Sequence, residues 1–345
     1  MTNTAPQFQV TNKPYKWLRR EIESLDPYKD YAKIWRLSIE YTSGGDFIQN
    51  LLYAYTFANF VATEWVSDVM WRNGSGRVLT QATDRVSETQ CHFSTWWYYG
   101  PHHPETMKSI DAINKRHRGH AKSYPGHFSH KDDYIYVLCF TAISVDRVRT
   151  KLRLSGFTEK QKIAAYLFWK EISRLFLVEV PGQDWRPLSE FPGFPEDWDG
   201  MYRFCEDVED HHIVATEKGH MVAEALFDQF AFRYFPSLLR PLGRALPICL
   251  SLPQTLKAHR VKGVNPVLAC MALFMAGTFI WIMEILLPDP KVSYQESLRM
   301  RSEDQNRKVK GENRKVDAAF PAWFARHHQG RAASCPFASP VNQGM

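Results

Sequence analysis

Three polar residues of this 345-residue chain have side chains that can do chemistry and fall on faces that are otherwise apolar. Arg85 and Thr89 lie four residues apart in DRVSETQCHFSTWW, and His117 follows in MKSIDAINKRHRGH. A polar group on a core face costs free energy unless a partner satisfies it. The pattern therefore predicts a cofactor or another polar ligand between two helices.

Helical spacing defines the two faces on which these residues lie. The first consists of Val78, Ala82, Arg85, Thr89, Phe93 and Trp96, and the second of Met107, Ile110, Ile113, His117 and Ala121. We expect both faces to point into the protein, with His117 directed inward.

An inward histidine can bind haem iron through one ring nitrogen while the other nitrogen bonds to a supporting group. An inward arginine such as Arg85 can pair with a haem propionate or stabilise negative charge that develops on bound oxygen. The hydroxyl of Thr89 can form a hydrogen bond to bound oxygen or to water. A histidine that core hydrogen bonds satisfy is the alternative, and spacing alone leaves both interpretations of His117 open.

A second metal site is conceivable in CEDVEDHH, where Glu206, Glu209 and His212 form an ExxE and an ExxH pattern. Four-helix di-iron proteins use two ExxH pairs and two further glutamates. Glu88 and His92 are spaced i, i+4, which can place them on one helix face but is a different motif. The alternatives are a non-haem iron site and a charged, solvated helix face.

Composition excludes several other classes of function. The net charge of +6 is mild, and the chain has no basic stripe with interleaved aromatics, so we expect no nucleic-acid partner. Its six cysteines include no CxxC pair, and phosphate-loop, GxSxG and HExxH patterns are absent. Aromatic residues make up 14% of the chain, which suits an interior that encloses a large apolar ligand.

Helical periodicity dominates the chain, so we expect an all-α fold with a single large multi-helix domain over 19–288. The helices are expected over 31–42, 46–72, 78–98, 104–121, 132–153, 159–178, 198–213, 216–232 and 266–287, with Thr158 and Gln161 forming a capping box. An N-terminal arm over 1–18 precedes the domain. The stretch 299–316 is rich in Lys and Arg, so we expect a basic, flexible C-terminal extension over 289–345.

The segment 267–283 contains no charged residue. Its seventeen residues lie at the lower limit for a membrane span, so the segment is either a buried core helix or a contact with a membrane. The N-terminal MTNTAPQFQV lacks an apolar run, and Arg19-Arg20 is followed by EIESL rather than by a twin-arginine export sequence. We therefore expect an intracellular protein, either cytoplasmic or membrane-associated.

The order of several segments resembles the family of haem-dependent oxygenases that contains MpaB and the rubber oxygenase latex-clearing protein. The resemblance covers about 19–288 and rests on LDPYKDYAKIWRLSIEY, DRVSET, INKRHRGHAKSYPGHFSHKDDYIYVLCF, TEKQKIAAYLFWKEISRLFLV, VPGQDW and FPSLLRPLG. It implies an all-α fold that encloses a b-type haem, with His117 as the axial ligand. It also implies that Arg85 and Thr89 match the family's distal RxxxT pattern.

The resemblance implies oxygenation of an apolar isoprenoid, lipid-like or secondary-metabolite substrate with dioxygen. One departure is Glu88, which stands where the rubber oxygenase has a lysine that can occupy the other axial position of the iron. Two alternatives stay open: a non-haem iron oxygenase, and a non-enzymatic lipid-binding or membrane-associated helical protein.

Overall fold

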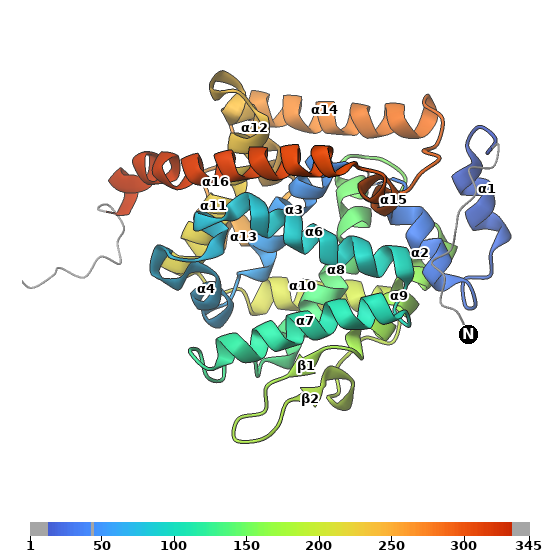
Figure 1. Ribbon diagram of the computed structural model, residues 1–345, viewed down its shortest axis with the longest axis horizontal. Coiled ribbons are helices and arrows are strands. Elements are labelled where there is room, and N and C mark those ends of the chain that lie inside the picture. Colours follow the sequence, from blue (N-terminus) through green and yellow to red (C-terminus); the bar gives the residue numbers. More distant parts are fainter. Residues whose placement is uncertain (1–12, 43–44, 333–345) are drawn as a thin grey trace, which may run out of the picture.

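The protein is all-α, as the sequence predicts. The computed structural model describes residues 13–42 and 45–332, and these contain sixteen α-helices and one two-stranded antiparallel sheet (Figure 1). The helices are α1 Trp17–Ser24, α2 Tyr31–Ile39, α3 Asp46–Phe60, α4 Glu64–Trp71, α5 Arg77–Thr80, α6 Ala82–Tyr99, α7 Pro104–Ala121, α8 Lys131–Lys151, α9 Glu159–Ser173, α10 Trp198–His211, α11 Glu217–Tyr234, α12 Arg240–Leu250, α13 Pro253–Ala258, α14 Pro266–Ile285, α15 Tyr294–Arg299 and α16 Glu303–Ala332. The strands are β1 Leu177–Val178 and β2 Arg186–Pro187.

Two expected helices are each divided in two. The helix expected over 46–72 breaks at 61–63 into α3 and α4, where the amide of Val214 donates a hydrogen bond to the carbonyl of Ala62 at 2.8 Å. The helix expected over 78–98 breaks at Gln81, so Val78 belongs to α5. Hydrophobic periodicity continues across both breaks, which is why it misses them.

The capping box at the start of α9 is confirmed, because the Thr158 side chain accepts from the Gln161 amide and Gln161 bonds back to Thr158. The helix ends at Ser173 rather than at 178, since Leu177 and Val178 pair with the segment at 186–187.

The core surrounds α3, α8 and α11, which lie inside the bundle (Figure 1). Helix α8 packs against α3, α9 and α10, and α11 packs against α3, α4 and α12. The largest fully buried side chains include Trp35, Trp169, Phe140, Phe168 and Phe227. Most of the aromatic content is therefore core material.

The expectation of a flexible extension does not hold for 303–332, which form helix α16 along α6 and α11. Its inner face has helical spacing and is buried, and consists of Asn313, Asp317, Phe320, Phe324 and His328. The basic residues of this stretch lie on the other faces, and their number obscures the buried stripe in a composition-based prediction. The N-terminal arm expected over 1–18 lies outside the described residues up to residue 12, and 333–345 also lie outside them.

Helix α16 supplies the N-terminal cap of α6. The side chain of Gln81, at the cap position itself, makes no capping bond. Instead the Asp317 carboxylate accepts from the amides of Thr83 at 2.7 Å and of Asp84 at 3.1 Å. A carboxylate at this position satisfies free amides and interacts favourably with the helix dipole.

We expect Asp317→Ala to lower the free energy of unfolding by about 1–2 kcal/mol, because two amides of α6 lose their acceptor. Urea unfolding followed by circular dichroism measures this change. The control Asp304→Ala removes an exposed carboxylate of α16 that pairs with Arg307, and its effect stays within about 0.5 kcal/mol. Equal effects for the two variants would contradict the capping role.

Helix α15 is held on α2 by a buried carboxylate. Glu40 is 1% exposed, and its Oε2 accepts from the Gln295 amide at 2.9 Å, while its backbone carbonyl accepts from Tyr294 at 3.0 Å. Burial raises the pKa of the Glu40 carboxyl from 4.5 to about 7. Between about pH 4.5 and pH 7, the Glu40 carboxyl therefore keeps a proton in the folded protein that it releases in the unfolded chain.

A raised carboxyl pKa makes a contribution to stability that is complete below about pH 4.5 and is lost as the pH rises through about 7. In the wild type, this group lowers the free energy of unfolding by roughly 3 kcal/mol between pH 4.5 and pH 8. We expect this decrease to be absent in Glu40→Gln, which keeps an oxygen acceptor for Gln295. Denaturant unfolding across this pH range, with exposed Glu23→Gln as control, measures it. Parallel pH profiles of Glu40→Gln and the wild type would contradict the assignment.

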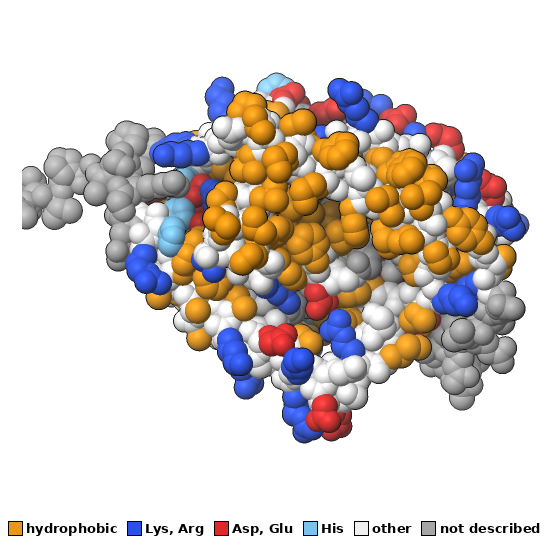
Figure 2. Space-filling view, turned by 90° about the horizontal axis from the view of Figure 1, so that it is seen from above, with side chains coloured by type: hydrophobic (Ala, Val, Ile, Leu, Met, Phe, Trp, Pro, Cys, Tyr) orange, Lys and Arg blue, Asp and Glu red, His pale blue; other side chains and the backbone are white. Residues whose placement is uncertain are grey.

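Helix α14 lies at the surface. The interpretation of 267–283 as a buried core helix is therefore wrong. Ala272 is its only buried residue. The helix lies along the surface against α12, and Gly277 lies close to Leu152 at the end of α8. Figure 2 shows a broad hydrophobic face on this side of the molecule. The helix is long and apolar enough to cross a membrane by length and composition.

Candidate functional site

A cavity of about 280 Å³ lies between α4, α6, α7 and α8. It is mostly apolar, with aromatic residues on several walls. Its lining consists of Phe57, Phe60, Val61, Trp65, Val66, Val69, Met70, Arg72, Arg77, Val78, Arg85, Thr89, His92, Phe93, Trp96, Ile113, Arg116, His117, His120, His127, Phe128, Asp133, Tyr134, Val137, Leu138 and Phe176.

The structure brings the three sequence-selected residues together. Arg85 and Thr89 of α6 and His117 of α7 all line this cavity. Of the other residues assigned to inward faces, Met107 is 44% exposed and does not belong there.

Three side-chain contacts set the register of α6 against α7. At one end, His92 Nδ1 and Trp96 Nε1 both lie within hydrogen-bond distance of Ser109 Oγ, at 2.7 and 2.9 Å. At the other end Glu88 pairs with Arg116. The antiparallel pair therefore gives the cavity an aromatic end near Trp96 and a basic end near Arg116.

His117 contributes a neutral imidazole to the cavity. Its Nδ1 lies 3.5 Å from the Tyr134 hydroxyl, and its ring lies 4.9 Å from that of Phe128. Burial, followed by the positive charges of neighbouring groups, lowers the pKa of His117 to about 3. A neutral ring at pH 7 keeps a nitrogen lone pair for a ligand.

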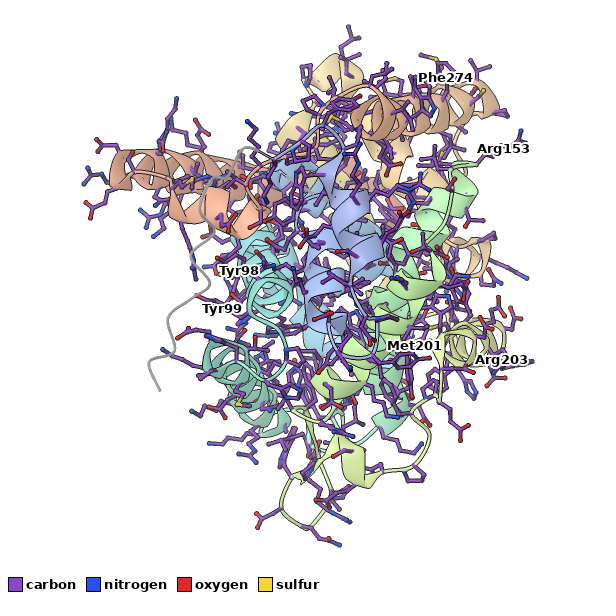
Figure 3. All side chains as sticks on the ribbon, turned by 90° about the vertical axis from the view of Figure 1, so that its right-hand side faces the viewer. Tyr98, Tyr99, Arg153, Met201, Arg203 and Phe274 are labelled. Atoms are coloured by element: carbon purple, nitrogen blue, oxygen red, sulfur yellow. The ribbon has the colours of Figure 1, made fainter. Side chains whose placement is uncertain are left out.

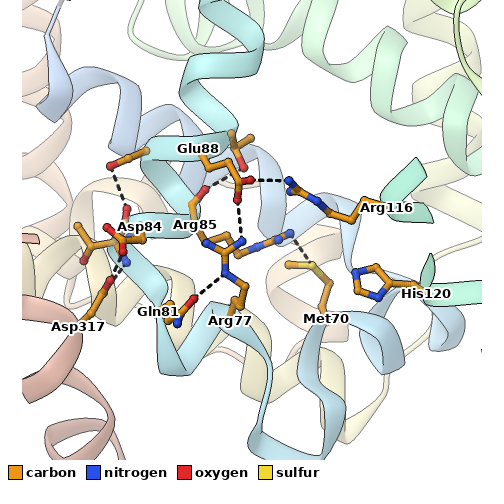
Figure 4. Close-up of polar contacts among 12 residues, drawn as sticks. Met70, Arg77, Gln81, Asp84, Arg85, Glu88, Arg116, His120 and Asp317 are labelled. Atoms are coloured by element: carbon orange, nitrogen blue, oxygen red, sulfur yellow. Dashed lines mark hydrogen bonds and ion pairs between the residues drawn. The ribbon is translucent and has the colours of Figure 1, made fainter. Parts of the chain in front are cut away.

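Arg85 has poor partners for a charged group. Its Nε is buried without a hydrogen-bond partner, and its Nη2 donates to the Met70 sulfur at 2.9 Å (Figure 4). The Phe57 ring lies 5.8 Å away. Thr89 Oγ1 donates to the Arg85 carbonyl at 3.0 Å, so its lone pairs stay available as acceptors. A guanidinium in such surroundings is arranged to meet an anion or a strong acceptor.

Glu88 does not line the cavity. It pairs with Arg77 at 2.7 Å and with Arg116 (Figure 4). Burial opposes ionisation, but hydrogen bonds from Arg116 and Arg77 outweigh it and lower the pKa of Glu88. Glu88 is therefore an ionised bridge between helices, and the structure gives it no position facing the cavity.

The carboxylate–histidine cluster of α10 is not assembled. Glu209 is buried and pairs with Arg147 at 2.5 Å and with the Tyr136 hydroxyl at 3.3 Å. Glu206 and His212 are exposed, and His212 lies nearest Asp207 at 3.9 Å. The proposed ExxE/ExxH site therefore has no structural basis, because its buried member is already neutralised by an arginine.

Among the described residues, only Glu224, Asp228 and His328 lie close enough together to bind a metal ion. Arg244 donates to both carboxylates, and His328 Nε2 lies 2.7 Å from Asp228. The guanidinium already occupies an oxygen of each carboxylate, so this cluster is an ion network that joins α11, α12 and α16.

Sequence reasoning missed several cavity residues. Arg72 and His120 interact at 3.0 Å on the basic side, while Phe128 and Tyr134 contact His117. The HxxH spacing of His117 and His120 places both on one side of α7 and was a usable signal. Arg72 follows α4 in a turn, where periodicity carries no information.

The protein is thus an all-α bundle with a mostly apolar cavity, and four histidines contribute to the lining of this cavity: His92, His117, His120 and His127. A family model described as "ER-bound oxygenase mpaB/B'/Rubber oxygenase, catalytic domain" matches residues 51–308. The chain belongs to this family of oxygenases. No curated protein matches the chain.

Proposed function

We propose that the protein is a haem-dependent oxygenase that acts on an apolar substrate with dioxygen, and that His117 binds the iron of haem b. One observation carries this proposal. His117, with a neutral ring, and Arg85, without a carboxylate partner, line the same mostly apolar cavity within the region that matches the oxygenase family. Among the described residues, no carboxylate forms an ion pair with Arg85.

The residues present fit such a group. The buried, unpartnered Nε of Arg85 requires an acceptor, which a propionate or negative charge on reacting oxygen would provide. A bound haem would supply dioxygen activation. Tyr134 orients the His117 ring from the Nδ1 side, Thr89 offers hydroxyl lone pairs, and the aromatic walls exclude water.

The apolar lining favours an isoprenoid, lipid-like or secondary-metabolite substrate. Phe57, Phe60, Phe93, Trp96 and Phe176 offer ring surfaces to a hydrocarbon chain. The same lining suits the alternative of a lipid-binding protein without catalysis, so the test must separate these two functions.

We expect the purified protein to show a Soret band that shifts on reduction, with about one iron per chain. His117→Ala loses this band or weakens haem binding by at least tenfold, because it removes the ring nitrogen that would hold the iron. Absorption spectra with iron quantification measure both. The exposed control His211→Ala keeps the wild-type spectrum.

An unchanged spectrum in His117→Ala would remove His117 from the ligand role. Wild-type protein that carries stoichiometric lipid, and neither iron nor a Soret band after reconstitution, would favour the lipid-binding function.

We also propose that α14 attaches the protein to a lipid surface, lying in the plane of the membrane. Phe274 is 72% exposed and lies at the outer edge of the molecule. Arg153 lies on the same side (Figure 3). Exposed Lys262 precedes the helix and exposed Lys291 follows it, where they suit anionic headgroups. Packing against α12 favours an in-plane orientation.

We expect the protein to float with vesicles that contain anionic phospholipid. The double variant Phe274→Asp, Phe279→Asp loses at least about tenfold in vesicle affinity, since two charges would enter the apolar layer. The control Val214→Asp changes an apolar residue that is 48% exposed elsewhere and keeps binding. A dimer in solution with no vesicle binding would instead assign this face to a second copy of the chain.

A further inference from the structure

The basic end of the cavity holds more positive than negative charge. Four arginines line the cavity, and they are Arg72, Arg77, Arg85 and Arg116. Glu88 pairs with two of them, Arg77 and Arg116. Among the described residues, Arg72 and Arg85 form no ion pair with a carboxylate. Asp133 also lines the cavity, but its carboxyl group accepts a hydrogen bond from the Trp65 indole.

Arg72 is held in place by contacts that leave part of its guanidinium available. Its Nε donates to the Val69 carbonyl at 2.9 Å, and its Nη2 donates to His120 Nε2 at 3.0 Å. A guanidinium has only donors, so His120 accepts this bond as a neutral ring. The Arg72 backbone is left-handed, with a φ of 49°, a conformation that is uncommon for a residue with a side chain.

The Arg72–His120 pair lies near His117 in the cavity lining. His120 follows His117 by three residues on α7, and such pairs lie about 5–6 Å apart between their Cβ atoms. A group bound at His117 therefore lies close to the Arg72–His120 pair. The opposite end, near Trp96 and Ile113, offers apolar surface. The cavity is thus built for an amphiphilic ligand with its acidic edge at one end.

We infer that Arg72, positioned by His120, is an anion-binding residue of the cavity and takes a propionate of the haem. This inference rests on the proposed function, because it assigns the orientation of the same cofactor. An arginine with a free edge binds a carboxylate through charge-assisted hydrogen bonds. Burial lowers the pKa of Arg72, the nearby Tyr124 opposes this effect, and the positive charges of Arg85 and Arg77 add to it.

Haem and haem dimethyl ester separate the carboxylate contribution from the rest of binding. The ester keeps the iron and the macrocycle but carries no charge on its side chains. We expect the apo-protein to bind haem about ten- to a hundred-fold more tightly than the ester in Soret titrations. In Arg72→Met this ratio falls to about threefold or less, and in Arg72→Lys part of the ratio returns.

The control is Arg118→Met, which removes an exposed arginine of the same helix as His120 that does not line the cavity and stacks on Trp185. It keeps the wild-type ratio. His120→Ala tests the positioning role, and we expect an intermediate ratio because Arg72 loses its fixed acceptor. Thermal unfolding of each apo-protein shows whether the variant is folded, and Arg72→Lys replaces Arg72→Met in the comparison if the latter is not.

Equal affinities of wild-type protein for haem and its ester would overturn the inference while leaving the proposed function intact. A wild-type ratio in folded Arg72→Met would also overturn it. Failure of the wild type to bind either porphyrin would overturn the proposed function itself. Stabilisation of the wild type but not of Arg72→Met by palmitate, with equal binding of both porphyrins, would reassign Arg72 to a substrate carboxylate.

Discussion

The bridging carboxylate of Glu88 is the interaction on which the cavity depends. It connects Arg77, at the start of α5, to Arg116 on α7, while standing on α6 itself. Arg85 and Thr89 stand on the same helix as Glu88, so the bridge to Arg116 of α7 holds them and His117 along one cavity. Glu88 pairs with two of the cavity's arginines, whereas Arg72 and Arg85 form no ion pair with a carboxylate of the described residues.

The position of α6 depends on a segment far from it in sequence. Asp317 accepts from two amides at the start of α6, and Phe320 and Phe324 anchor α16 in the core. The family match ends at residue 308, so most of α16 lies beyond it. A helix outside the matched region thus fixes the N-terminus of the helix that carries Arg85, and the extension is part of the structural unit around the cavity.

The all-α class, most helix positions and the convergence of Arg85, Thr89 and His117 on one cavity could be predicted from apolar periodicity. The breaks at 61–63 and Gln81 could not, because apolar periodicity continues across both. The contacts made there come from distant segments, Val214 at Ala62 and Asp317 at the start of α6. Helix α16 was missed because a basic composition outweighed a buried stripe of few residues. Arg72 was missed for a different reason: it lies in a turn, where only the fold determines that its side chain points toward His120.

The surroundings of Arg85 lead us to expect that the stability of this protein depends on ligand binding. The Arg85 guanidinium lies beside the Met70 thioether, the Phe57 ring and the Tyr53 hydroxyl, and none of these supplies the negative charge that would offset its lost hydration. A ligand that supplies carboxylate oxygens would offset this cost on binding, so we expect it to stabilise the folded protein. The aromatic end offers apolar surface, which favours burial of hydrocarbon without fixing its direction. We therefore expect the basic end to orient a bound ligand and the apolar end to limit how much hydrocarbon the cavity can hold.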